Sequence, residues 1–137
     1  VALADRPELF TFSMHCGSNF PFRKAQSDLD LALPDHLDDE GYLGILSSYL
    51  PELLDEIVPD ILLYDAGVDV YGGALLGRLD LTREGITRRD RYVIQQALAR
   101  EIPVATVIGG GYDRDLRELS DRHATVHRAA AELLTIN

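Results

Sequence analysis

The sequence predicts an α/β domain: a parallel sheet with helices on both faces. Two observations lead to this class. Apolar, β-branched runs such as 104–108 are almost continuously hydrophobic, which is typical of strands buried in a parallel sheet. These runs alternate with longer segments whose apolar residues recur every three or four positions, the spacing of one helical face. Alternating strands and helices imply parallel strands joined by right-handed crossovers.

Each expected strand is a short apolar or β-favouring run that ends at turn residues. The run at 28–34 alternates Leu with Asp or Ala, which is typical of a half-buried strand, and Pro34 stops it. In chain order, the expected strands are 8–14, 28–34, 61–64 and 104–108.

The helical segments carry apolar residues at three-four spacing and polar residues suited to helix starts. Asp38 or Asp39 can cap the first helix, and Pro51 implies either a kink or the start of a second helix. Thr87 and Asp90 have the spacing of a capping box in the next helix. The expected helices are 40–57, 86–101 and 116–134.

Composition and charge exclude several classes of protein. The 137 residues are 46% hydrophobic and 26% charged, which is typical of one globular domain. The net charge of −10 argues against a nucleic-acid partner. A single cysteine, Cys16, excludes an internal disulfide and a cysteine-based zinc site. With no membrane span and no signal peptide in these residues, we expect a cytoplasmic protein without a membrane partner.

Residues suited to chemistry follow three of the expected strands. His15 ends the first strand, a glycine-rich turn at 65–74 follows the third, and Gly109–Gly111 with Tyr112 follow the fourth. The carboxyl ends of parallel strands lie at one edge of a sheet, where α/β proteins bind ligands. Three glycines allow a tight turn or a close approach, and a tyrosine can offer its hydroxyl to a substrate. The alternative is a plain strand-to-helix turn in which Tyr112 packs on a neighbour.

Several motifs in order along the chain resemble the zinc-dependent histone deacetylase family and its bacterial deacetylase-like relatives. The resemblance implies an arginase-like fold and hydrolysis of acetyl-lysine-type amides, with acetylated proteins or small-molecule amides as substrates. It maps residues 1–137 onto the carboxyl-terminal portion of the family's catalytic domain, so we expect the first half to lie elsewhere. The motifs are Thr11-Phe12-Ser13-Met14-His15, Asn19-Phe20-Pro21, Asp65-Ala66-Gly67-Val68-Asp69, Gly77-Arg78-Leu79 and Gly109-Gly110-Gly111-Tyr112.

The resemblance also implies roles for single residues. Tyr112 corresponds to the tyrosine that donates its hydroxyl to the amide carbonyl. Gly109, Gly110, Gly111 and Phe20 correspond to the walls of the substrate tunnel.

A second group of implied roles is structural. Ser13 and Met14 correspond to a strand end that helps to hold a structural monovalent cation such as K⁺. His15 belongs to the same segment, and we expect it to have a structural role and not to bind zinc.

The chain departs from the family pattern at the metal. The family implies Zn²⁺ with three protein ligands, but Ala74 stands where a ligating Asp is expected, and alanine has no donor atom. The family's Asp-x-His pair and histidine dyad correspond to positions upstream of Val1. The zinc ligands are therefore absent from these residues, and we expect this chain alone to be inactive.

The remaining metal-ligand residue types have plainer interpretations. We expect Asp65 and Asp69 to hydrogen-bond their own turn, and cation binding by these carboxylates is the alternative. His123 and His127 lie one helical turn apart and are interpreted as helix-surface residues.

Two other functions compete with this interpretation. A dinucleotide-binding loop would place glycines at 109, 111 and 114, but position 114 is arginine. A degenerate deacetylase-like domain kept for binding or assembly would explain Ala74. Missing upstream strands would also leave a bare sheet edge, through which copies of the chain could associate.

Overall fold

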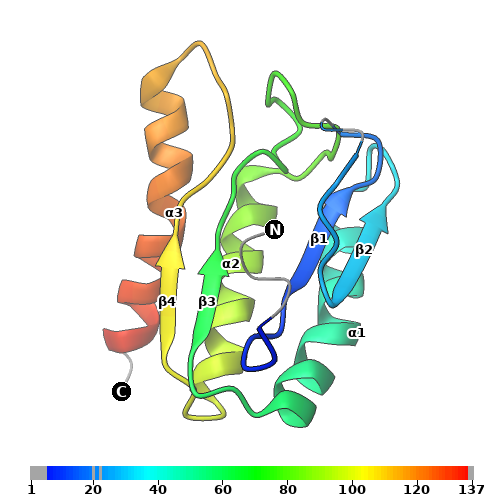
Figure 1. The fold of residues 1–137 in the computed structure, drawn as a ribbon. Helices are drawn as coiled ribbons and strands as arrows, with labels where there is room; N and C mark the ends of the chain where they lie inside the picture. Colours follow the sequence, from blue (N-terminus) through cyan, green and yellow to red (C-terminus); the bar gives the residue numbers. More distant parts are fainter. Residues whose placement is uncertain (1–5, 20, 22, 136–137) are drawn as a thin grey trace.

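The computed structural model describes residues 6–19, 21 and 23–135, and it has the predicted order of elements (Figure 1). Parallel strands alternate with helices, so the α/β class is confirmed. None of the described helices is both long and apolar enough to cross a membrane. The strands are β1 (Phe12–Cys16), β2 (Leu29–Leu33), β3 (Leu62–Asp65) and β4 (Val104–Val107), and the helices are α1 (Asp39–Ile57), α2 (Arg83–Leu98) and α3 (Leu116–Thr135).

The four strands form two parallel pairs. Phe12 of β1 lies opposite Leu29 of β2, and Leu62 of β3 lies opposite Val104 of β4. In Figure 1, β3 lies beside β1, so that β2 and β4 are the outer strands of one layer. All four arrows point toward the same end of the molecule, which brings the loops after β3 and β4 together there.

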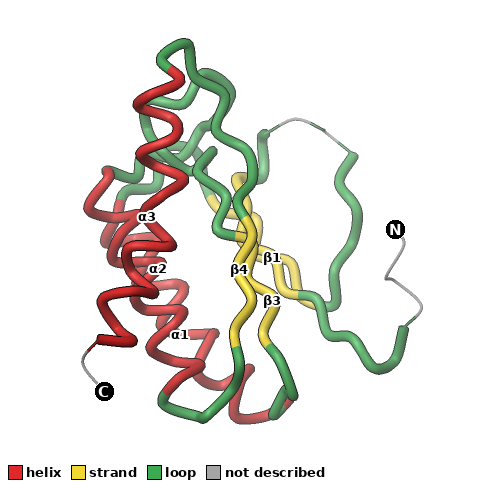
Figure 2. Tube along the Cα trace, turned by 90° about the vertical axis from the view of Figure 1, so that its left-hand side faces the viewer, coloured by secondary structure: helices red, strands yellow, loops and turns green. Residues whose placement is uncertain are grey.

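The three helices lie on one side of the strand layer, where the sequence predicts helices on both faces (Figure 2). The path of the chain explains the difference. The connections from β2 through α1 to β3, and from β3 through α2 to β4, advance across the layer in the same direction (Figure 1). Right-handed crossovers that advance in one direction place their helices on one face.

The one-sided packing also corrects the expectation that β3 and β4 are buried on both faces. Along each of these strands, half-buried residues alternate with exposed ones. Leu63 is 70% exposed and Val107 is 57% exposed, on the face opposite the helices. Apolar runs therefore predicted the strands correctly. They did not predict that the described residues cover only one face of these strands.

Two aspartates and a threonine determine where α1 and α2 begin. Asp38 accepts a hydrogen bond from the amide of Gly41, and Thr82 accepts one from the amide of Gly85, so these are the two N-caps. Asp39 holds Thr82 in place by accepting bonds from its amide and its hydroxyl, at 2.8 and 2.6 Å. The second helix thus starts at Arg83 and not at residue 86, because its cap Thr82 is held by Asp39 of α1.

Two sequence expectations about the helices are settled by this arrangement. The capping box predicted for Thr87 and Asp90 is wrong, because Asp90 lies inside α2 and is buried. Pro51 neither ends α1 nor starts a second helix, since α1 continues through it as a single helix.

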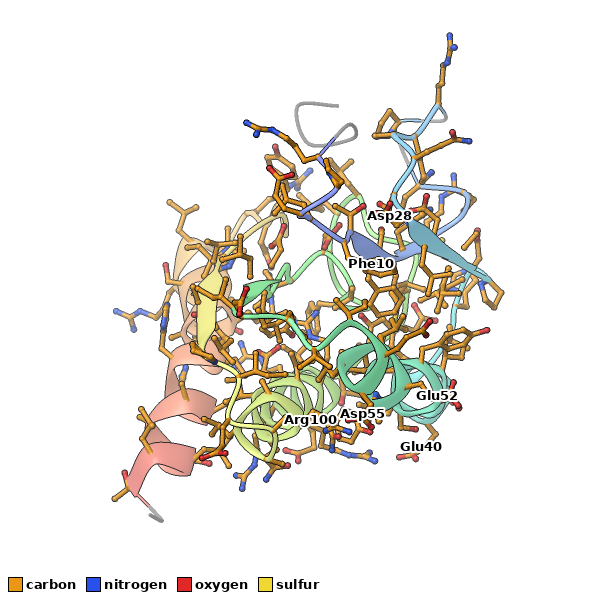
Figure 3. The ribbon with its side chains drawn as sticks, turned by 60° about the horizontal axis from the view of Figure 1, so that its bottom comes forward. Phe10, Asp28, Glu40, Glu52, Asp55 and Arg100 are labelled. Carbon is orange, nitrogen blue, oxygen red and sulfur yellow. The ribbon has the colours of Figure 1, made fainter. Side chains whose placement is uncertain are left out.

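The main core lies between the strand layer and α1 and α2. Leu46, Leu50 and Leu54 of α1 pack there with Ile86 and Val93 of α2. At the end of the molecule away from the β3 and β4 loops, Arg100 donates two hydrogen bonds to Asp55 of α1, at 2.6 and 2.9 Å (Figure 3). This bidentate pair joins the turn after α2 to α1. The candidate site lies at the opposite end of the molecule.

Candidate active site

The turn after β3 and the glycine run after β4 lie side by side, joined by three backbone hydrogen bonds. The amide of Ala66 donates to the carbonyl of Val107 at 2.9 Å, and the amide of Val68 donates to Gly109 at 3.0 Å. Farther along, the amide of Leu75 donates to the carbonyl of Tyr112 at 3.3 Å. The two segments that the sequence predicts to meet at this edge therefore do so.

Each of the three glycines lies against the neighbouring turn. A Cβ at Gly109 would lie 2.9 Å from a carboxylate oxygen of Asp65, and one at Gly110 would lie 2.9 Å from the carboxyl carbon of Asp69. Gly110 and Gly111 also have left-handed backbone, with φ of 59° and 76°. The glycines are thus required by close approach within the chain, and their role as substrate-tunnel walls stays a prediction.

Replacing Gly111 by alanine should lower the free energy of unfolding by about 1–3 kcal/mol, because a Cβ there meets Val68 and the left-handed backbone disfavours side chains. Urea denaturation measures the change. The control is Gly44→Ala in α1, where an added Cβ meets no atom within 4 Å. That variant should be stabilised by up to about 1 kcal/mol, since alanine is the better helix former. Equal stability of Gly111→Ala and the wild type would contradict the prediction.

Tyr112 presents its side chain at this edge and is 68% exposed. The amide of Leu75, the residue after Ala74, donates a hydrogen bond to the backbone carbonyl of Tyr112. The backbone of Tyr112 therefore lies beside the turn that carries Ala74. This exposure shows that Tyr112 is not turned into the interior, while the alternative of a plain turn in which it packs on a neighbour stays open. The side chain of Tyr112 is therefore accessible to a ligand, and its backbone lies beside the turn that carries Ala74.

Among the described residues, no group of three or more His, Cys, Asp or Glu side chains could hold a metal ion. Ala74, at the position where the family implies a ligand, contributes only a methyl group. Asp65 and Asp69 are exposed and face Gly109 and Gly110. In this part of the chain, neither carboxylate makes the predicted hydrogen bond to its own turn.

The end of β1 contributes a second part of this edge. Ser13 Oγ lies 2.9 Å from His15 Nδ1, and both side chains line a shallow depression of about 280 Å³ together with Asp69. Met14 points the other way, into the core. The hydroxyl predicted to help hold a cation and a carboxylate of the β3 turn thus border one hollow, and the cation itself stays a prediction. Phe20, the predicted tunnel wall, lies outside the described residues.

Asp35 anchors the loop after β1. It accepts hydrogen bonds from the Ser18 hydroxyl, from the Cys16 thiol at 3.3 Å and from Arg78 at 3.2 Å. Of these donors, the Ser18 hydroxyl contributes most to lowering the pKa of Asp35, from 3.8 to about 2. The folded chain thus holds this carboxylate in its charged form.

The lowered pKa predicts a loss of stability in acid. A folded-state pKa below the unfolded value gives stability that is fully present above about pH 4 and is lost as the pH falls through about 2. Asp35→Asn should therefore show a smaller fall of the urea midpoint between these pH values than the wild type. Asp60→Asn, at an exposed site, serves as the control and should keep the wild-type acid response. Identical acid profiles for the wild type and Asp35→Asn would contradict the assignment.

A buried polar network below the β3 turn was not predicted from the sequence. Arg89 and Asp90 of α2 are 3% and 1% exposed. Arg89 donates to Asp90 at 2.9 Å and to the carbonyl of Gly67 at 2.7 Å, and the Tyr64 hydroxyl donates to Asp90 at 2.6 Å. Burial raises the pKa of the Tyr64 phenol well above its ordinary value, which keeps the phenol a hydrogen-bond donor. The network fixes the β3 turn from beneath.

The sequence shows the residues of this network but not their burial. Arg89-Asp90 is a charged pair on adjacent helical positions, and Asp90 was interpreted as a capping residue because of its spacing from Thr87.

The two histidines of α3 differ in their surroundings. The interpretation of His127 as a surface residue agrees with its exposure, whereas His123 is half-buried and its Nδ1 atom is enclosed.

Sequence comparisons identify relatives of this chain. The sequence model of the histone deacetylase domain matches residues 1–129. An uncharacterised protein of Picosynechococcus sp. is 52% identical over 129 residues, which are 94% of this chain and 43% of that protein. Histone deacetylase 2 of Arabidopsis thaliana is 28% identical over 113 residues, which are 80% of this chain and 29% of that protein.

Solved structures of the same kind share the fold. An acetylpolyamine aminohydrolase of Burkholderia pseudomallei superimposes with a TM-score of 0.71 at 20% identity, over 88% of this chain and 37% of that one. The histone deacetylase Clr3 gives a TM-score of 0.72 at 18% identity, over 93% of this chain and 23% of that one. The fold is therefore the deacetylase arginase-like fold.

An α/β protein with a tyrosine-bearing glycine loop at the carboxyl edge of its strands is the class that the fold and the site define. Within that class, this chain belongs to the histone deacetylase domain family. It spans less than half the length of the relatives that it matches.

Proposed function

We propose that this chain forms the carboxyl-terminal portion of a deacetylase-family domain and supplies one wall of its amide-cleaving pocket. The observation that supports the proposal is the exposed side chain of Tyr112, whose backbone carbonyl is bonded by Leu75 beside Ala74. There the hydroxyl can donate a hydrogen bond to an amide carbonyl and stabilise the negative charge that develops on its oxygen. The substrates would be acetylated proteins or small-molecule amides, and the location would be the cytoplasm.

The proposal includes that these 137 residues alone neither bind zinc nor hydrolyse an amide, because Ala74 has no donor atom. Zinc content after metal loading and turnover of an acetyl-lysine peptide test this part. Stoichiometric zinc with turnover by the isolated chain would refute it.

A non-catalytic domain kept for binding or assembly is the second candidate, and Ala74 favours it. A chimera separates the two. The chain replaces the matched segment of the Picosynechococcus relative, with either alanine or aspartate at position 74. The catalytic proposal expects zinc and acetyl-lysine turnover with Ala74→Asp and far less of both with Ala74. If Ala74→Asp binds zinc but stays inactive while the relative is active, the non-catalytic alternative is the better account.

We also propose that copies of the chain associate through the strand layer. Leu63 and Val107 expose apolar surface on the face that carries no described helix, and β4 has a free edge. Sedimentation velocity over a range of concentrations should show self-association by the wild type and less by Leu63→Lys. A monomer at all concentrations would contradict the proposal.

A further inference from the structure

Arg122 of α3 is a buried cation that contacts both loops of the candidate site. Its side chain is 3% exposed. One end of the guanidinium donates to Asp113, with 2.6 Å between Nη2 and Oδ2. Its face covers the ring of Tyr71, with 4.5 Å from the guanidinium carbon to the ring centre. Asp113 follows Tyr112 in the glycine loop, and Tyr71 lies in the turn that carries Ala74.

Burying a guanidinium is costly, so its few partners have to compensate for the lost hydration. The Nε atom of Arg122 is enclosed without a hydrogen-bond partner among the described residues. Compensation thus rests on the Asp113 carboxylate and the Tyr71 ring. Both contacts are made only when the two loops lie together, because one partner comes from each loop.

Before Tyr112, the loop is held by the backbone bond from Val68 to Gly109, but few side chains hold the residues that follow. Gly110 and Gly111 have no side chains to pack, and the Tyr112 side chain is largely exposed. Its carbonyl accepts one bond, from Leu75, at 3.3 Å. Asp113 uses its other oxygen to accept from the amide of Asp115 at 3.0 Å, so that the same carboxylate shapes the turn into α3.

We propose that Arg122 is a positioning residue that holds the Tyr112 loop against the Ala74 turn through Asp113 and Tyr71. The positioning role of Arg122 extends the proposed function, and it rests on that function only where Tyr112 is taken to bind the substrate. A reacting group misplaced by about 1 Å loses much of its effect, so a loop rich in glycine needs such a clamp. Arg122 itself does not touch the substrate.

Hydrogen exchange of the whole chain, read by mass spectrometry without metal or substrate, tests the proposal. Arg122→Met should speed exchange of the hydrogen-bonded amides in 71–75, including that of Leu75 bonded to Tyr112, by about tenfold or more, while amides of α1 keep their wild-type rates. Arg122→Lys keeps the charge and should recover part of the protection. The matched control is Arg128→Met on the same helix, whose partner is the exposed Asp121 and which should leave the loop unchanged.

Two results would overturn the proposal: unchanged loop exchange in Arg122→Met, or an equal increase in every segment, which would indicate a purely structural role. If Arg122→Met does not fold, Asp113→Asn removes the ion pair from its less buried side and should speed exchange of the same amides in 71–75. Unchanged exchange in Asp113→Asn would equally refute the clamp. Because the measurement needs no turnover, an inactive chimera with a protected loop would count against the proposed function and leave the clamp intact.

Discussion

Asp90→Ala should lower the free energy of unfolding by about 3–5 kcal/mol, because it leaves the buried Arg89 guanidinium without its charged partner. The Tyr64 hydroxyl loses its acceptor in the same variant, which adds to the loss. Urea denaturation measures the change, provided that the transition stays two-state.

The controls for this prediction separate charge from hydrogen bonding. Asp90→Asn keeps an acceptor for Tyr64 but removes the negative charge, so it should lie between the wild type and Asp90→Ala. Asp121→Ala removes an exposed carboxylate that pairs with Arg83 and Arg128, and it should cost less than about 1 kcal/mol. If Asp90→Ala costs no more than Asp121→Ala, the network does not stabilise the fold.

The second large effect is expected for Tyr112→Phe in an active chimera that carries Asp at position 74. The phenol is proposed to bond the carbonyl oxygen as negative charge develops on it, so its removal should lower kcat by about 10²–10³-fold. KM should change much less, because the interaction strengthens in the transition state. Steady-state kinetics with an acetyl-lysine peptide measure both constants.

Tyr49→Phe, on the exposed surface of α1, is the matched control and should leave kcat unchanged. An active Tyr112→Phe chimera with wild-type kcat would remove Tyr112 from the mechanism. The hydrogen-exchange experiment on Arg122 would keep its meaning in that case, because it reports the position of the loop alone.

The order of the elements could be predicted because each one carries a complete local signal. The alternation in 28–34 gave β2, and the three-four spacing across Pro51 gave α1, since a helix with enough apolar contacts tolerates one proline. The start of α2 could not be predicted, because its cap Thr82 is held by Asp39 from another helix. Such a contact is absent from any short window of sequence.

The candidate site was predicted unevenly for a similar reason. The glycine run and Tyr112 are adjacent in sequence and follow a strand, so their place at the carboxyl edge could be inferred. The charged residues that support them, Arg89 and Arg122, lie on helices, where charge usually indicates a solvated surface. Their burial depends on tertiary partners that periodicity does not show.

The open face of the strand layer couples the stability of this chain to whatever covers it. Leu63 and Val107 are only partly buried by folding, so much of the roughly 1.5–3 kcal/mol that each side chain contributes on full burial is not yet gained. That hydrophobic free energy becomes available only on association. By mass action, any partner that binds this face of the folded chain, and not the unfolded chain, raises the apparent melting temperature in proportion to the logarithm of its concentration.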